Sequence, residues 1–201
     1  MSSWRDNLPK TRPMGFIAAC ALSLLVCVFY PSDLASYRAN MEAEKPFCVE
    51  PTETKLRFVN TIAQVAMPLL LRDKEGMVQL LTLAVATTVG TQGLKRIIND
   101  VQVGGTRLGE RPYAPDSRHN MPSGHSSMSS CAVYFVARRY GWRHLFYLVP
   151  ILLLTMGARL MLDAHTLSAV LAGCLIGFIC AAWFTSPYRK KTAPPASPSE
   201  N

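Results

Sequence analysis

The sequence predicts an all-α fold, a six-span transmembrane helical bundle, and three observations carry this prediction. Hydrophobic residues make up 49% of the 201-residue chain, and charged residues make up only 17%. The apolar residues collect into long blocks separated by short charged segments, which is the pattern of a membrane protein. The length suits one domain, so we expect a single integral-membrane domain over residues 1–188. The segment 189–201, rich in proline and serine, is expected to be a disordered tail.

Six apolar blocks are expected to form the six helices. The first block follows a basic start, as a signal peptide does, but no small-residue cleavage site follows, so we interpret it as a retained anchor. The second block contains Pro68, which a membrane helix tolerates when neighbouring groups satisfy the freed backbone. The predicted helices span residues 14–30, 57–71, 77–95, 124–140, 144–162 and 166–186.

The charge and cysteine patterns narrow the class of partner. The net charge is +8, but the basic residues lie between apolar blocks without interleaved aromatic residues, so we do not expect nucleic acid as a partner. Anionic lipid headgroups of a bilayer are the expected partner. The six cysteines lack metal-ligand spacing and lie mostly inside apolar blocks, so we expect neither a metal site nor a disulfide framework. Neither the charge pattern nor the cysteine pattern specifies an oligomeric state.

A polar turn, Pro122-Ser123-Gly124-His125, opens the fourth predicted helix. A helix N-terminus presents unpaired backbone N–H groups and the positive end of the helix dipole, so the amides of Ser123 and Gly124 are expected to face an anion. His125 lies in the first turn of this helix and is expected to reach toward the same point. The turn therefore predicts an anion site at the mouth of the helix.

Two further segments carry ionisable residues at the same end of the predicted bundle. Lys95 and Arg111 flank the loop before the polar turn, whereas Arg159 and His165 flank the turn before the last helix. Arginine binds phosphate oxygens with a planar, bidentate fork, and lysine adds a point charge. Two histidines supply a nucleophile and a general acid, which is what cleavage of a phosphoester needs. This chemistry requires no metal and no other cofactor.

Taken together, the three segments resemble the signature of the type 2 phosphatidic acid phosphatase superfamily of membrane lipid phosphatases. That signature reads Lys-x6-Arg-Pro, then Pro-Ser-Gly-His, then Ser-Arg-x5-His-x3-Asp, and the resemblance covers residues 95 to about 173. Pro-Ser-Gly-His is a weak match by itself and becomes specific with the other two segments in order. The resemblance implies a six-span fold with a site built from the segments 95–125 and 159–169.

The resemblance also implies a role for each matching residue in the metal-independent hydrolysis of a lipid phosphate or diphosphate. His165 would attack the phosphorus and form a phosphohistidine, and His125 would protonate the leaving oxygen. The remaining residues of the signature would hold the phosphate oxygens, namely Lys95, Arg111, Ser123, Gly124 and Arg159. The substrates it implies are a polyprenyl diphosphate such as undecaprenyl diphosphate, a phosphate of lipid A, or a phospholipid phosphate such as phosphatidylglycerophosphate.

The sequence departs from the signature at three points. Fifteen residues rather than six separate Lys95 from Arg111, Ala158 replaces the serine before Arg159, and Ala169 stands where the family usually has aspartate. The last departure matters most, because in the family that aspartate orients the nucleophilic imidazole and stabilises its charge.

Two interpretations of Ala169 follow. Either Asp163 or Ser168 orients His165 in place of the aspartate, or the chain is an inactive relative that binds or transports lipid. The stretch from His165 to Ser168 resembles the His-Thr-x-Ser variant of dolichyl-diphosphatase-like members, which also lack the aspartate, and this favours activity. Phosphotransfer to another lipid at the same site remains an alternative to hydrolysis.

The distribution of basic residues predicts the orientation in the membrane. Six spans put both termini on one side, and that face carries eleven basic residues against ten on the other. Six of those ten lie in the segments expected to be catalytic, and without them the count is four against eleven. The positive-inside rule then predicts cytoplasmic termini, with the loop 96–122 and the turn 162–166 on the periplasmic face of a bacterial inner membrane.

Overall fold

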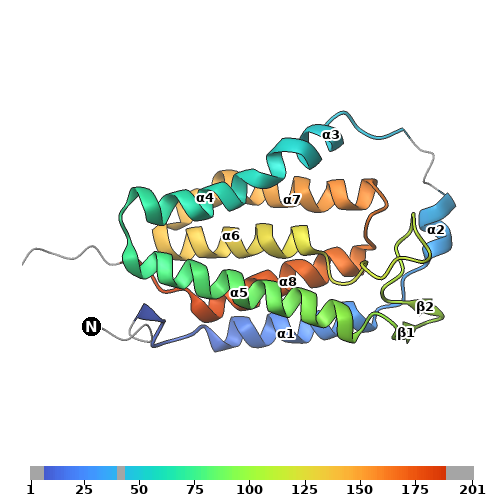
Figure 1. Cartoon of the computed structure of the whole chain (residues 1–201), viewed down its shortest axis with the longest axis horizontal. Coiled ribbons are helices and arrows are strands. Elements are labelled where there is room, and N and C mark those ends of the chain that lie inside the picture. Colours follow the sequence, from blue (N-terminus) through green and yellow to red (C-terminus); the bar gives the residue numbers. More distant parts are fainter. Residues whose placement is uncertain (1–6, 40–43, 189–201) are drawn as a thin grey trace, which may run out of the picture.

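The structure is a computed structural model, which describes residues 7–39 and 44–188. Within these residues, six long helices lie side by side (Figure 1). Each begins and ends within three residues of its predicted position, so the six predicted helices are confirmed. They are α1 (Met14–Phe29), α4 (Arg57–Leu70), α5 (Lys74–Ile97), α6 (Gly124–Tyr140), α7 (Leu145–Met161) and α8 (Leu167–Phe184). The predicted tail, 189–201, lies outside the described residues.

Short elements connect the long helices. The strands β1 (Gln102–Val103) and β2 (Thr106–Arg107) pair in a small antiparallel hairpin between α5 and α6. The remaining short elements are the helices α2 (Leu34–Ala39) and α3 (Val49–Pro51), the π-helical turn η2 (Thr52–Leu56) and the 3₁₀ turn η3 (Trp142–His144). Because α3 and η2 run directly into α4, the second helical segment begins at Val49, well before the predicted start at residue 57.

Three of the described helices are long and apolar enough to cross a membrane, by length and composition: Lys74–Ile97, Trp142–Met161 and Leu167–Phe184. The helix α1 is apolar but shorter. The mostly helical fold is therefore that of an integral membrane protein, while the number of six spans stays a prediction.

Helix α6 lies at the centre of the bundle and contacts α4, α5, α7 and α8 (Figure 1). Its buried face consists largely of serine and alanine, which lets neighbouring backbones approach closely. Helix α8 makes the closest approach: a Cβ atom at Gly173 or Gly177 would collide with the backbone of Ser123 or Ser127. The Ser130 hydroxyl donates a 2.8 Å hydrogen bond to the Cys174 carbonyl across this interface.

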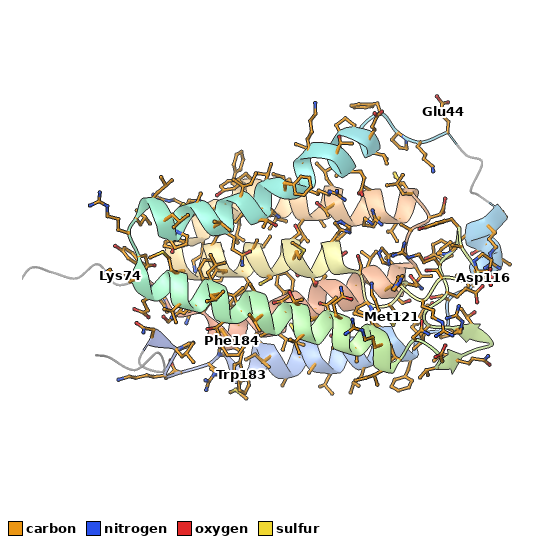
Figure 2. All side chains as sticks on the ribbon, in the orientation of Figure 1. Glu44, Lys74, Asp116, Met121, Trp183 and Phe184 are labelled. Atoms are coloured by element: carbon orange, nitrogen blue, oxygen red, sulfur yellow. The ribbon has the colours of Figure 1, made fainter. Side chains whose placement is uncertain are left out.

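The two ends of the bundle differ. Gln79 donates hydrogen bonds to the Asn7 carbonyl at 2.6 Å and to the Ser186 hydroxyl at 2.8 Å, so both ends of the described chain meet at one end of the bundle. The α5–α6 loop, which carries Asp116 and Met121, lies at the opposite end from Lys74 (Figure 2). The segments with the predicted site residues therefore gather at the end away from the termini.

Candidate active site

His165 lies in the turn between α7 and α8 and is only 2% exposed. Its Nδ1 atom is 2.6 Å from the backbone carbonyl oxygen of Asn120. A carbonyl oxygen only accepts hydrogen bonds, so Nδ1 carries the proton and Nε2 keeps its lone pair. This is the tautomer that a nucleophilic imidazole needs.

Asn120 is held in place by a reciprocal pair of hydrogen bonds with the residue that follows His165. The Asn120 side-chain amide donates to the Thr166 hydroxyl at 3.2 Å, and the Thr166 backbone N–H donates to the Asn120 side-chain oxygen at 3.0 Å. Both residues are buried. The loop carbonyl and the imidazole are thus fixed relative to each other, and the sequence analysis missed Asn120.

Asp163 and Ser168 are the two residues expected to orient His165 in place of the aspartate. Among the described residues, neither Asp163 nor Ser168 makes a hydrogen bond to His165. Ser168 is the second residue of α8, and its hydroxyl contacts the hydroxyls of Thr166 at 3.0 Å and Ser32 at 2.9 Å. Ala169, at the position of the family aspartate, is fully buried in an apolar cluster with Leu108 and Met121.

Lys95 and Arg111 converge on one backbone atom. The Lys95 ammonium and an Arg111 guanidinium nitrogen donate to the His119 carbonyl at 3.0 and 3.1 Å. The β1–β2 hairpin takes up part of the longer spacing between the two cations, so Lys95 reaches the site despite the fifteen intervening residues. Arg111 also donates to the Tyr113 hydroxyl at 2.8 Å.

Arg159 lies in the last turn of α7 and connects the site to a segment outside the signature. It donates to the Glu53 carboxylate at 2.7 Å, and the same oxygen accepts from Arg57 at 2.5 Å. Arg57 is in turn 2.9 Å from Nε2 of His125. The sequence analysis missed Glu53 and Arg57, although an i,i+4 acid–base pair at a membrane border was a signal for them.

Ser123 occupies the N-cap position of α6 without a side-chain capping hydrogen bond, and its amide is engaged within the protein rather than free for an anion. The Ser123 N–H donates to the Ala169 carbonyl at 2.9 Å, because α8 passes directly over this turn. The Ser123 hydroxyl accepts a 3.1 Å hydrogen bond from Ser126. Of the two backbone amides expected to face an anion, only the N–H of Gly124 is still a candidate for that role.

The charges of the site shape the chemistry of His165. Burial and the positive charges of Arg111, Arg159 and Lys95 hold the pKa of His165 well below its ordinary value, although the hydrogen bond to Asn120 acts to raise it. The imidazole is therefore neutral at neutral pH. The Nε–H groups of Arg57, Arg111 and Arg159 are buried without a hydrogen-bond partner among the described residues. A neutral imidazole is a nucleophile, and guanidinium groups with unpaired N–H donors can bind phosphate oxygens, so the arrangement suits attack on the phosphorus of a bound phosphate.

The described residues contain no group of three or more histidine, cysteine, aspartate or glutamate side chains that could hold a metal ion. The Glu53 carboxylate, whose charge acts on His125, is engaged by two arginines.

Comparisons with known proteins agree with the sequence signature. A family model described as the PAP2 superfamily matches residues 76–193. A lipid A 1-phosphatase of Helicobacter pylori is 41% identical over 182 residues, which cover 90% of this chain and 93% of the relative. A lipid A 4'-phosphatase of the same organism is 34% identical over 172 residues, which cover 85% of this chain and 83% of the relative.

One solved structure has a similar fold. It is the crystal structure of a transmembrane PAP2 type phosphatidylglycerolphosphate phosphatase from Bacillus subtilis, with a TM-score of 0.60 and 19% sequence identity. The similarity covers 84% of this chain and 93% of that chain. At this level of identity the likeness shows a shared fold.

Proposed function

The chain belongs to the PAP2 superfamily, and from this premise we propose that it removes the 1-phosphate group of lipid A by metal-independent hydrolysis. One observation supports the chemistry: the charges of Lys95 and Arg159 act on both His125 and His165, and the charge of Arg111 acts on His165 as well. The preference for lipid A over other lipid phosphates is supported by the 41% identity to a lipid A 1-phosphatase, against 34% to a lipid A 4'-phosphatase.

Phosphate binding is the first step of the proposed reaction. Lys95, Arg111 and Arg159 neutralise the non-bridging oxygens, and the Ser123 hydroxyl and the Gly124 amide complete the site at the mouth of α6. Arg111 and Lys95 already point at one carbonyl, so little reorganisation is needed for them to turn to a phosphate.

Phosphoryl transfer follows in two halves. Nε2 of His165 attacks phosphorus, the N–P bond forms and the ester P–O bond breaks, while His125 protonates the leaving sugar oxygen. Water then attacks the phosphohistidine with His125 as the general base, which releases phosphate and restores His165. The Asn120 carbonyl accepts from Nδ1–H throughout and supports the positive charge that develops on the ring.

The proposed location is a bacterial inner membrane with the site on the periplasmic face and both termini in the cytoplasm. Two features support it: the surplus of basic residues at the end with the termini, and the meeting of both described chain ends at Gln79. One domain over residues 1–188 accommodates the whole site.

Phosphate release by the purified protein in detergent tests the proposal. The substrates are bisphosphorylated lipid A, lipid A that carries only the 1-phosphate or only the 4'-phosphate, undecaprenyl diphosphate and phosphatidylglycerophosphate. We expect release from the two lipids with a 1-phosphate, mass spectra that show loss of that group, and no release by His165→Ala.

Each other outcome has a defined meaning. Release that prefers undecaprenyl diphosphate or phosphatidylglycerophosphate would contradict the proposed substrate but retain the mechanism. Transfer of the phosphate to an added lipid acceptor would favour phosphotransfer. Equal release by wild type and His165→Ala would contradict the histidine mechanism.

A further inference from the structure

The π-helical turn η2 brings two residues outside the family signature into contact with the site. Single π-helical turns within helical segments occur often at functional sites, because the extra residue per turn redirects the side chains that follow. Here the turn aims Glu53 and Arg57 at the cationic cluster, and one Glu53 oxygen bridges Arg57 at 2.5 Å and Arg159 at 2.7 Å. The Glu53 carboxylate therefore pairs with Arg159, which the proposed reaction needs to bind phosphate.

Arg57 also constrains the general acid. Its guanidinium can only donate hydrogen bonds, so Nε2 of His125, 2.9 Å away, accepts and carries no proton in this arrangement. His125 cannot give a proton from Nε2 while Arg57 contacts it. Arg57 must therefore leave this nitrogen before the leaving oxygen can be protonated there.

Arg57 shares a property with the two arginines already proposed to bind phosphate. The Nε–H groups of Arg57, Arg111 and Arg159 are all buried without a partner among the described residues. At the other end of the bundle, Arg138 also has a buried Nε–H without a partner among the described residues, whereas Arg139 has its Nε–H paired with a carboxylate. The unused donor of Arg57 therefore counts only together with its contact to His125 and the carboxylate that it shares with Arg159.

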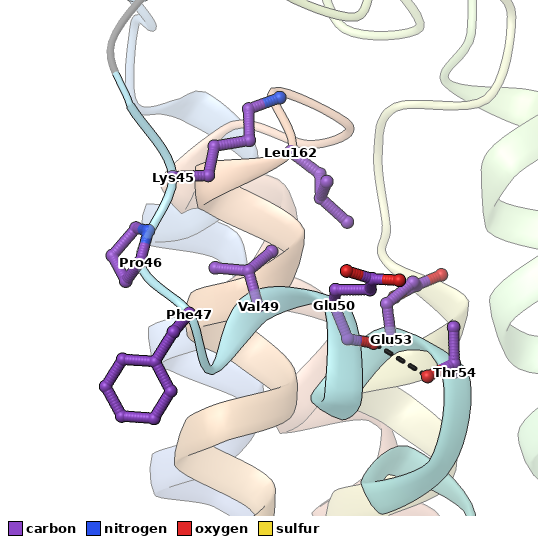
Figure 3. Close-up of a pocket in the computed structure, with 8 residues that line it drawn as sticks. All are labelled: Lys45, Pro46, Phe47, Val49, Glu50, Glu53, Thr54 and Leu162. Carbon is purple, nitrogen blue, oxygen red and sulfur yellow. Dashed lines mark hydrogen bonds between the residues drawn. The ribbon is translucent and has the colours of Figure 1, made fainter.

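A cavity beside Glu53 gives the carboxylate somewhere to go. It has a volume of about 380 Å³, and Glu50, Glu53 and Leu162 lie around it, with the Phe47 ring turned outward (Figure 3). The Glu53 side chain is 26% exposed, so water already reaches it. If Glu53 swings into this cavity, its charge becomes hydrated rather than buried without a partner.

We propose that Arg57 is a further phosphate-binding residue and that the substrate phosphate displaces Glu53 from Arg57 and Arg159. The inference rests on the proposed function, because it concerns the same site. A phosphate monoester carries about two negative charges and three acceptor oxygens, whereas Glu53 offers one charge and uses one oxygen for both arginines. When Arg57 turns to the phosphate, Nε2 of His125 becomes free to take up a proton from solvent water, which it then delivers to the leaving oxygen.

Binding of inorganic phosphate to the full-length protein in detergent tests this inference without requiring turnover. The dissociation constant is measured by thermal stabilisation for wild type, Glu53→Gln, Arg57→Gln and Arg57→Lys. Two matched controls are Lys55→Gln, an exposed residue of the same turn, and Glu50→Gln, a carboxylate that lines the same cavity.

The proposal predicts opposite signs for the two residues. Glu53→Gln should lower the dissociation constant for phosphate about 3-fold or more, because a neutral amide competes less well for the arginines. Arg57→Gln should raise it about 10-fold, with Arg57→Lys in between, and both controls should stay within about 2-fold of wild type. A purely structural carboxylate would give a raised constant in Glu53→Gln, since Arg159 would lose its support.

Two results would overturn the inference. A raised or unchanged constant in Glu53→Gln contradicts displacement, and an Arg57→Lys variant that folds and binds phosphate like wild type contradicts the role of Arg57. Failure of the proposed function is distinct from both: phosphate would then bind with the predicted pattern while no lipid phosphate is hydrolysed.

Discussion

The two ends of the bundle treat buried charge in opposite ways. At the end with the termini, the side chains of Arg139 and Asp73 are 1% and 5% exposed and form a bidentate pair, with N···O distances of 2.5 and 2.7 Å. The third guanidinium nitrogen of Arg139 donates to Gln79 and Ser186. Every donor group of this arginine therefore has a partner, and the charge is neutralised where it stands.

At the opposite end, positive charge is left over. Among the described residues, Lys95 and Arg111 have no carboxylate within ion-pair distance and share a backbone carbonyl, while Arg57 and Arg159 share the single carboxylate of Glu53. Such a surplus costs stability through mutual repulsion, and it is retained where a ligand supplies the missing negative charge. We therefore interpret the bidentate pair of Arg139 and Asp73 as structural and the surplus of positive charge at the other end as the proposed phosphate site.

Removal of an arginine from the site end should affect activity and leave the fold intact. In Arg111→Ala we expect phosphate release to fall by roughly 10²–10³-fold, because a charged donor aimed at the phosphate is lost. The melting temperature should not fall, since a repulsive neighbour of Lys95 and Arg159 is gone. Paired kinetic and thermal measurements check this, with Arg118→Ala, an exposed arginine of the same loop, as the control. A large loss of melting temperature without loss of activity would break the comparison.

Removal of the arginine at the other end should do the reverse. In Arg139→Gln the buried Asp73 loses its partner, which should lower the free energy of unfolding by about 3–5 kcal/mol. Burial acts to raise the pKa of Asp73, but hydrogen bonds from Arg139, the Gly76 amide and Tyr140 hold it below its ordinary value. This stability is thus present above the ordinary aspartate pKa and is lost as the pH falls through the lowered value.

Thermal unfolding of Arg139→Gln in detergent measures this effect, and Arg138→Gln on the same helix turn is the matched control. Arg138 makes no ion pair within the described residues, so its replacement should cost well under 1 kcal/mol. Activity per folded molecule should stay near that of wild type in both variants. Equal destabilisation by the two variants would show that the buried pair does not stabilise the fold.

The positions of the six long helices were predictable because apolar blocks separated by short charged segments are visible in the sequence. The six long helices were found to within three residues because apolar blocks and turn residues such as Pro122 and Gly141 mark their limits. The extension of α4 back to Val49 was not predicted. The residues Glu50, Glu53 and Lys55 make that segment polar, so neither apolar periodicity nor composition indicates a helix there.

The site was predictable only where side chains form a sequence signature. The family residues stood out by type and spacing, and the structure brings Lys95, Arg111 and Arg159 to the histidines. The hydrogen-bond partner of His165 was not predictable, because it is the backbone carbonyl of Asn120. Every residue has a backbone carbonyl, so the sequence does not distinguish this one from the others. The sequence pattern could offer only side chains near position 169 for this role, and the part of Asp163 or Ser168 in orienting His165 stays a prediction.

Loosening of the loop that holds this carbonyl should give a smaller effect than loss of Arg111. In Asn120→Ala the carbonyl remains but loses the two hydrogen bonds to Thr166, so the imidazole is oriented less well. We expect kcat to fall about 10–100-fold with KM changed less than kcat, as for other residues that orient a reacting group. Asn120→Asp keeps the acceptor for the Thr166 amide and should retain more activity than the alanine variant.

The predictions for Asp163→Ala and Ser168→Ala separate the loop carbonyl from the alternatives. Neither side chain contacts His165 among the described residues, so each variant should keep activity within about 3-fold of wild type. A loss of activity in Asp163→Ala or Ser168→Ala as large as that in Asn120→Ala would show that the altered side chain orients His165.

Removal of metal should have the smallest effect of all. Four cationic side chains already surround the histidines and can neutralise a phosphate without a metal ion, and the one carboxylate among them is engaged by Arg57 and Arg159. A divalent cation at that point would have to compete with two guanidinium groups for a single acid. We therefore expect phosphate release to be unchanged after treatment with EDTA and dialysis. If activity disappears and magnesium restores it, the surplus charge at this end does not serve phosphate directly, and the contrast between the two ends loses its functional meaning.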